Sequence, residues 1–95
     1  MDIYELRICF REDRFRLSHH AEEERGHARL KIDELREAGC RAELLSIDES
    51  KPGGTRYLLR GTTDLGRVVY MPVVLKENGI ALVVSVYERK SKRNR

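Results

Sequence analysis

The dipeptide Asn78-Gly79 stands between two runs of apolar and β-branched residues, 67–76 and 80–88, and this pattern constrains the fold most. Asn-Gly tolerates positive φ at both central positions of a tight turn, so the two runs are predicted to form an antiparallel hairpin. The run 55–61 precedes them and also has strand character. We therefore predict a meander of three antiparallel strands, with a fourth and weaker strand at 41–48.

The N-terminal half carries helical signals instead. Apolar residues recur at helical spacing over 3–12, and a brief extended piece follows at 15–18. Ser18 is a suitable N-cap for a second helical stretch that runs to about residue 38, and Gly39 is predicted to end it as a C-cap. Leu30 falls off the apolar stripe of that stretch, which indicates a kink or break near residues 29–31.

Together these segments predict an α+β fold: two N-terminal helical segments packed on a four-stranded antiparallel sheet that ends in a meander. Residues 1–88 form the single domain, because 95 residues suit one core. Residues 89–95 form a basic tail that is predicted to be disordered. Pro72 lies inside the third strand and cannot donate a ladder hydrogen bond, so a bulge or an unpaired edge is expected there.

The last two strands are apolar on both faces, whereas a half-exposed sheet would alternate with polar residues. Two helical segments cover roughly one face. We therefore hypothesise that a second copy of the chain, or another protein partner, covers the other face.

Charge is distributed unevenly along the chain. Residues 1–50 carry 9 basic and 13 acidic residues, whereas residues 51–95 carry 10 basic and 3 acidic ones. Five of the positive charges lie in the tail, so the basicity does not indicate a broad nucleic-acid face. Such a tail can bind anionic partners including RNA, or it can serve only as a solubilising end.

The chain has no apolar run long enough for a transmembrane helix, and its cysteines, Cys9 and Cys40, form no C-x-x-C pair. We expect a cytoplasmic protein with no secretory signal and no membrane association. We expect free thiols, and the alternative is one disulfide between the two cysteines. His20, Glu24 and His27 share one helical face, but the two histidines are about 10 Å apart along the axis. We expect no metal site and no cofactor.

His20 is the first candidate for chemistry, because it is predicted at a helix start beside a strand end. A helix N-terminus disfavours imidazolium and attracts anions, so a neutral imidazole there can act as a general base. The alternative is a histidine that caps or hydrogen-bonds the helix. Both interpretations remain open.

Arg56, Arg60 and Arg67 lie on neighbouring predicted strands or at their ends, and their guanidiniums can converge on a phosphate. Arg56 and Arg60 share a strand face, whereas the position of Arg67 depends on register. The alternative is a solvated basic face. Tyr87, near the end of the last strand, is either an aromatic at the edge of the core or a phenol that positions a reacting group.

At these residues the chain resembles a bacterial domain-of-unknown-function family, number 4258. Ser18-His19-His20-Ala21 resembles its Ser-x-His-Ala signature. Gly61, Gly66-Arg67 and Ser85-Val86-Tyr87 resemble its strand-ending glycine, its Gly-Arg hairpin and its final strand. The resemblance covers about residues 3–88. It departs where the family places arginines four and eight residues after the histidine, because Glu24 and Ala28 stand there.

The family in turn resembles small ribonuclease toxins of the RelE and BrnT kind in its order of helices and sheet. This resemblance implies metal-independent RNA cleavage, in which the ribose 2′-OH attacks the adjacent phosphate. His20 would then act as general base or acid, Arg67 and Arg60 would hold the phosphate, and Tyr87 would orient or donate a proton. The alternative function is a non-catalytic interaction module that binds itself or an antitoxin-like partner.

Overall fold

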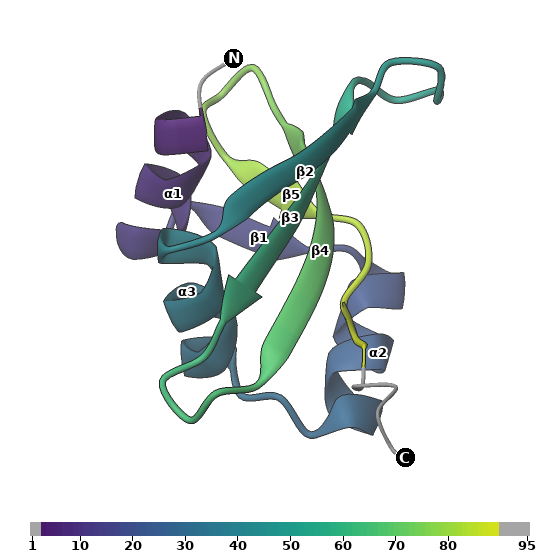
Figure 1. The fold of residues 1–95 in the computed structure, drawn as a ribbon. Helices are drawn as coiled ribbons and strands as arrows, with labels where there is room; N and C mark the ends of the chain where they lie inside the picture. The colour runs from purple at the N-terminus through teal and green to yellow at the C-terminus, as the bar shows by residue number, and fades with distance from the viewer. Residues whose placement is uncertain (1–2, 90–95) are drawn as a thin grey trace.

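The computed structural model of the protein describes residues 3–89. These residues form three helices and a mixed sheet, with α1 and α3 side by side against one face and α2 lying apart from them (Figure 1). The helices are α1 (Ile3–Arg11), α2 (His19–Ala28) and α3 (Ile32–Cys40). The strands are β1 (Phe15–Leu17), β2 (Glu43–Asp48), β3 (Arg56–Thr62), β4 (Val68–Leu75), β5 (Ala81–Val83) and β6 (Tyr87–Glu88).

The strand order is β1-β5-β4-β3-β2, and β6 also pairs with β4. The α+β class is confirmed, and β3, β4 and β5 form the predicted antiparallel meander. The predicted sheet of four strands, all antiparallel, is corrected. β1 adds a parallel partner to β5. It has only three residues, too few to reveal its sheet position from an alternating pattern.

The second helical stretch is broken where Leu30 falls off the stripe, as predicted. Arg29 ends α2 in the left-handed conformation at φ 58°, and Leu30 turns into the core. Ser18 caps α2 by accepting a hydrogen bond from the Ala21 N–H at 3.0 Å, which confirms that prediction. The predicted C-cap at Gly39 is wrong, because α3 continues through Cys40.

Gly39 is instead a packing residue inside the core between α1, α3 and the sheet. A Cβ atom there would lie 2.1 Å from Cγ of Phe10, which is fully buried. Gly61 on β3 is also a packing residue, because a Cβ atom there would lie 1.9 Å from the carbonyl oxygen of Ala38. The two glycines therefore allow α3 to approach both α1 and β3 closely.

Pro72 interrupts the last strand, and the predicted irregularity is confirmed on the partner side. Val73 pairs with Val83 and Tyr70 pairs with Tyr87, so two residues of β4 lie opposite three residues, 84–86. The Pro72 carbonyl points toward this segment and accepts from Val84 N–H at 2.8 Å. The backbone nitrogen of Pro72 faces the same segment but has no hydrogen to donate. The predicted single strand 80–88 is consequently split into β5 and β6.

Residues 84–86 do not form a regular strand, and their polar groups hydrogen-bond to α2 and its N-cap. Ser18 Oγ donates to the Val84 carbonyl at 3.0 Å, while Glu24 accepts from Ser85 Oγ at 2.6 Å and from Val86 N–H at 2.8 Å. The polar groups freed by the interruption thus position α2 beside β6.

Among residues 3–89, no helix is long and apolar enough to cross a membrane. Arg89 is the only residue of the predicted tail that the structure describes, and the prediction for 90–95 lies outside the described residues.

Candidate functional site

The outer face of the sheet, opposite α1 and α3, carries one polar and aromatic row. Residues in register on neighbouring antiparallel strands share a face. Arg60 pairs with Glu43 on one side and with Tyr70 on the other, and Tyr70 pairs with Tyr87. Val69 and Met71, which flank Tyr70, are fully buried on the opposite face. Strand register therefore aligns a carboxylate, a guanidinium and two phenol rings.

The members of this row contact one another. Arg60 donates to the Glu43 carboxylate, and this bond, followed by one with Tyr70, raises the pKa of Arg60 above its usual value. Tyr70 and Tyr87 stack with ring centroids 5.3 Å apart and planes 6° from parallel. The Arg89 guanidinium carbon lies 5.1 Å from the Tyr70 ring centroid. Tyr70 is 9% exposed, so the groups that face solvent at the β6 end of the row are chiefly the half-buried Tyr87 ring and the exposed Arg89 side chain.

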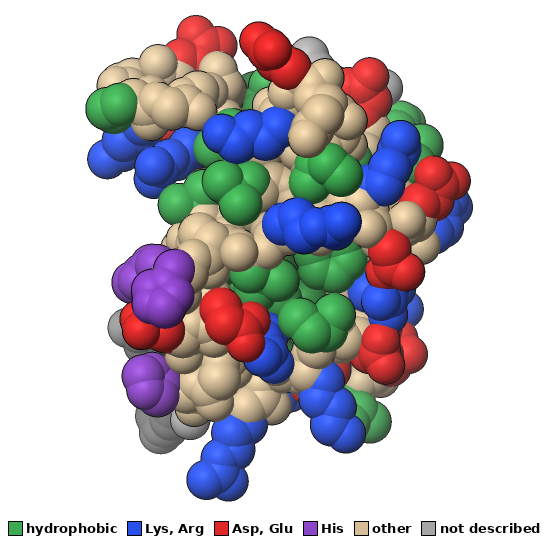
Figure 2. Space-filling view, turned by 180° about the vertical axis from the view of Figure 1, so that it is seen from behind, with side chains coloured by type: hydrophobic (Ala, Val, Ile, Leu, Met, Phe, Trp, Pro, Cys, Tyr) green, Lys and Arg blue, Asp and Glu red, His purple; other side chains and the backbone are tan. Residues whose placement is uncertain are grey.

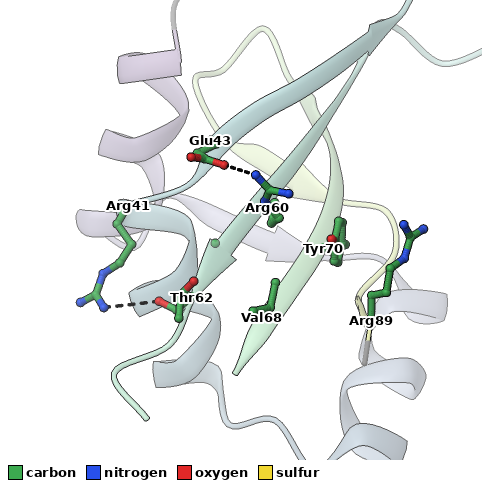
Figure 3. A pocket seen from close by; sticks show the side chains of 8 residues that line it. Arg41, Glu43, Arg60, Thr62, Val68, Tyr70 and Arg89 are labelled. Atoms are coloured by element: carbon green, nitrogen blue, oxygen red, sulfur yellow. Dashed lines mark hydrogen bonds and ion pairs between the residues drawn. The ribbon is translucent and has the colours of Figure 1, made fainter. Parts of the chain in front are cut away.

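An open hollow of about 620 Å³ lies over this row. It is lined by Arg41, Glu43, Arg60, Gly61, Thr62, Val68, Tyr70 and Arg89 (Figure 3). Arg41 lies at the rim, where it donates to Asp64 at 2.7 Å. Arg89 has no carboxylate partner among residues 3–89. The lining holds three arginines and one glutamate, so it carries an excess of positive charge and suits an anion.

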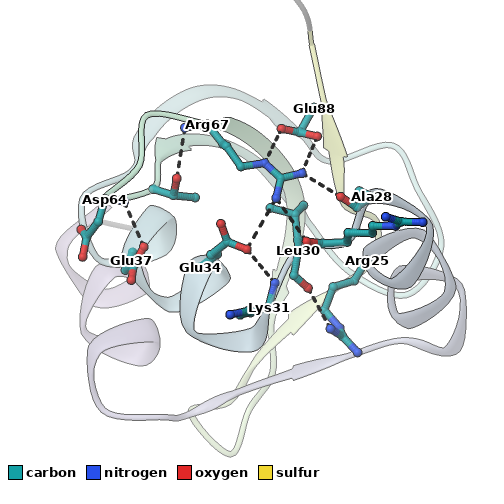
Figure 4. Close-up of polar contacts among 11 residues, drawn as sticks. Arg25, Ala28, Leu30, Lys31, Glu34, Glu37, Asp64, Arg67 and Glu88 are labelled. Atoms are coloured by element: carbon teal, nitrogen blue, oxygen red, sulfur yellow. Dashed lines mark hydrogen bonds and ion pairs between the residues drawn. The ribbon is translucent and has the colours of Figure 1, made fainter.

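Arg67, the predicted phosphate ligand, is engaged by the protein itself. Its Nε and Nη2 atoms each donate to Glu88 at 2.8 Å, and Nη2 also donates to the Ala28 carbonyl at 2.7 Å (Figure 4). Nη1 donates to the Arg29 carbonyl at 3.2 Å and lies 3.6 Å from Glu34. Arg67 therefore ties the end of α2 to β6 and α3.

His20 lies in the first turn of α2 and is 67% exposed, with Nε2 3.2 Å from Glu24 Oε2. Burial opposes ionisation of Glu24, but the bonds from Ser85 and Val86, with His20 nearby, lower its pKa. The carboxylate thus orients the imidazole. Figure 2 shows the histidine side chains gathered along α2, which holds all three. Within residues 3–89, no group of ligands could hold a metal ion.

The structure does not bring the three predicted catalytic residues into one hollow. Arg67 bonds Ala28 at the end of α2, whereas His20 begins it, roughly 12 Å away along the axis. Tyr87 and Glu88 are adjacent in β6, so their side chains point to opposite faces, and Glu88 holds Arg67. Tyr87 stacks at the margin of the hollow, while His20 and Arg67 do not line it.

Of the two predicted phosphate ligands, Arg60 lines the hollow and Arg56 lies four residues earlier on the same face of β3. Three residues that line the hollow were not predicted as site residues: Tyr70, Arg41 and Arg89. Tyr70 alternates with apolar neighbours as a core residue would, and its partner Tyr87 is fixed only by the interruption opposite Pro72. The sequence pattern that could have indicated this site was the placement of Arg60 and Arg56 on one face of the same predicted strand.

Comparisons with family models, with curated proteins and with solved structures found no match to this chain. The resemblance to family 4258 and to RelE-type toxins therefore stays a hypothesis that depends on the short motifs given above.

Proposed function

We propose that the protein binds single-stranded RNA on the outer face of its sheet. The observation that carries this proposal is the hollow lined by three arginines and Tyr70, with Tyr87 stacked on Tyr70 at its margin. Guanidiniums bind phosphates, and unstacked bases pack on aromatic rings or on guanidinium planes. Few other ligands need both groups within one hollow.

Single-stranded RNA fits better than duplex or DNA for two reasons. Stacking on a protein ring requires a base that is not already stacked in a helix. Glu43 also lies in the hollow and can accept a hydrogen bond from a ribose 2′-OH, which DNA lacks. An acidic residue beside Arg60 would otherwise only weaken the binding of a phosphate.

Binding has more support than the hypothesised cleavage. Cleavage by the hypothesised set needs Arg67 at the phosphate, but its guanidinium already contacts Glu88 and two carbonyl oxygens. His20 retains a carboxylate partner and an exposed ring, so it stays the candidate for proton transfer. Incubation of total RNA with the wild type and with His20→Ala tests this; loss of cleavage in the variant alone would support catalysis.

The binding proposal is tested by fluorescence anisotropy with a labelled oligouridine of eight nucleotides. Arg60→Gln should weaken binding about tenfold, because it removes one charge-assisted contact of about 1.5 kcal/mol or more. Arg11→Gln is the matched control: it removes the same charge from α1, across the sheet from the hollow. Equal losses for the two variants, or no binding by the wild type, would contradict the proposal.

A second candidate, a protein-interaction module, is favoured by the sheet edge. Among residues 3–89, β2 is the last strand in the order and pairs only with β3, and it presents Leu45 and Ile47 at 40% and 50% exposure. Exposed edges of this kind can pair with another chain. Light scattering across concentration tests self-association; a larger mass that reverts to the monomer in Ile47→Lys would support it.

A further inference from the structure

Arg56 carries a second guanidinium along the outer face. It lies four residues before Arg60 on β3, and alternation places both side chains on the same face. At about 3.3 Å per residue their backbone positions are ~13 Å apart. At this separation the two guanidiniums can contact different phosphates of a longer chain.

Arg56 is not neutralised in the way that Arg60 is. Its partner across the strands is Asp48, the counterpart of Glu43 opposite Arg60. The Asp48 carboxylate accepts instead from Ser50 N–H at 2.9 Å and from Ser50 Oγ at 2.6 Å. These bonds, and Arg56 more weakly, hold the pKa of Asp48 below its usual value.

The Arg56 side chain has an unmet hydrogen-bond donor. Its Nε is buried and has no partner among the described residues, and no ion pair is formed by its guanidinium there. A buried donor left unbonded is destabilising, whereas a ligand that reorders the side chain can satisfy it. The phosphate oxygens of a bound strand are acceptors of the required charge.

Apolar residues lie between the two arginines. Leu58 stands midway along β3 and pairs with Pro72 on β4, and both are partly exposed on the outer face. Apolar side chains pack against sugars and base faces without fixing a sequence. The outer face therefore offers a cationic hollow, an apolar step and a second cation in line along β3.

We propose that this line is a track for an RNA strand, in which the hollow at Arg60 and the guanidinium of Arg56 hold two separate phosphates. The inference builds on the proposed RNA binding and specifies the ligand as an oligonucleotide. At about 3.4 Å per nucleotide in a stacked strand, ~13 Å corresponds to roughly four nucleotides, and to fewer where the bases are splayed apart. Dinucleotides fill the hollow alone, and strands of six or more reach Arg56.

The test compares a labelled octauridine with an unlabelled diuridine, the latter measured by competition. Arg56→Gln should weaken octauridine binding about fivefold or more and leave diuridine binding unchanged. It should also reduce the slope of log affinity against log salt by about 0.7, the value for one phosphate contact on a single strand. Arg60→Gln should weaken both ligands, and Arg11→Gln neither.

RNA binding at the hollow and the second phosphate contact at Arg56 can be refuted separately. If Arg60→Gln weakens octauridine binding but Arg56→Gln changes neither the affinity nor the salt slope, the track is refuted and the hollow stands. If Arg56→Gln weakens diuridine as much as octauridine, the separate second contact is refuted as well. If wild type binds neither ligand, RNA binding itself is refuted.

Discussion

Replacing Arg67 with alanine distinguishes a structural arginine from a catalytic one. The side chain makes two bonds to Glu88 and bonds to the carbonyls of Ala28 and Arg29, and 28% of it is exposed. Hydrogen bonds to charged groups contribute about 1.5–3 kcal/mol each when well shielded. Water can replace part of this network at its exposed edge, so we expect a total loss of ~2–3 kcal/mol in the free energy of unfolding.

A loss of that size should lower the melting temperature by about 10–20 °C, since domains of 60–100 residues shift by roughly 4–8 °C per kcal/mol. Thermal unfolding followed by circular dichroism at pH 7 measures it. Arg67→Lys keeps the charge but lacks the planar fork, so it should recover less than half of the loss.

A melting temperature within about 3 °C of wild type for Arg67→Ala would refute this reasoning. The contacts with α2 and β6 would then contribute almost nothing. Arg67 would be free to serve as the phosphate ligand of the original hypothesis, and the RNA-cleavage assay would be repeated with this variant.

Four further substitutions test the packing, the cap of α2 and the Glu24 carboxylate. Gly61→Ala should destabilise by about 3 kcal/mol in urea unfolding, because its Cβ would meet the Ala38 backbone, which no rotamer can relieve. Gly26→Ala, with open space around the new methyl, should instead stabilise by about 0.5–1 kcal/mol. Ser18→Ala should cost about 1–2 kcal/mol through loss of the cap of α2, seen as a lower melting temperature. Glu24 has a lowered pKa in the fold, so its contribution is present above its ordinary value of 4.5 and is lost as the pH falls through the folded-state pKa. Glu24→Gln should therefore be less stable than wild type at pH 7, and the difference should disappear in acid melts.

The local features of this fold were predictable because their causes are local. Ser18 caps α2 with its own side chain, and the stripe fails where Leu30 turns inward. The hairpin predicted at Asn78-Gly79 joins β4 and β5, but positive φ occurs at Gly79 and not at Asn78, and Gly79 N–H closes the turn by donating to the Lys76 carbonyl. Each depends on the spacing of a few adjacent residues. The parallel pairing of β1 with β5 was not predictable, because it depends on how the chain returns after some 60 residues.

The candidate site shows the same division. Alternation alone put Arg56 and Arg60 on one face, and the structure agrees. The sequence could not show that Arg67 hydrogen-bonds to Glu88, because that contact joins residues 21 positions apart across a loop and the interrupted strand. Nor could it show that Tyr70 meets Tyr87, because the extra residue opposite Pro72 shifts the register.

Two of the motifs that suggested a family meet at the irregular pairing opposite Pro72. Pro72 presents no N–H to the last strand, so segment 84–86 leaves the regular ladder and offers its polar groups to α2. Ser18 and Ser85, which belong to two separate motifs, both bond across that junction. The two serines therefore help to hold α2 against the sheet. The proposed RNA contacts are made by residues of the outer face, which the motifs largely omit.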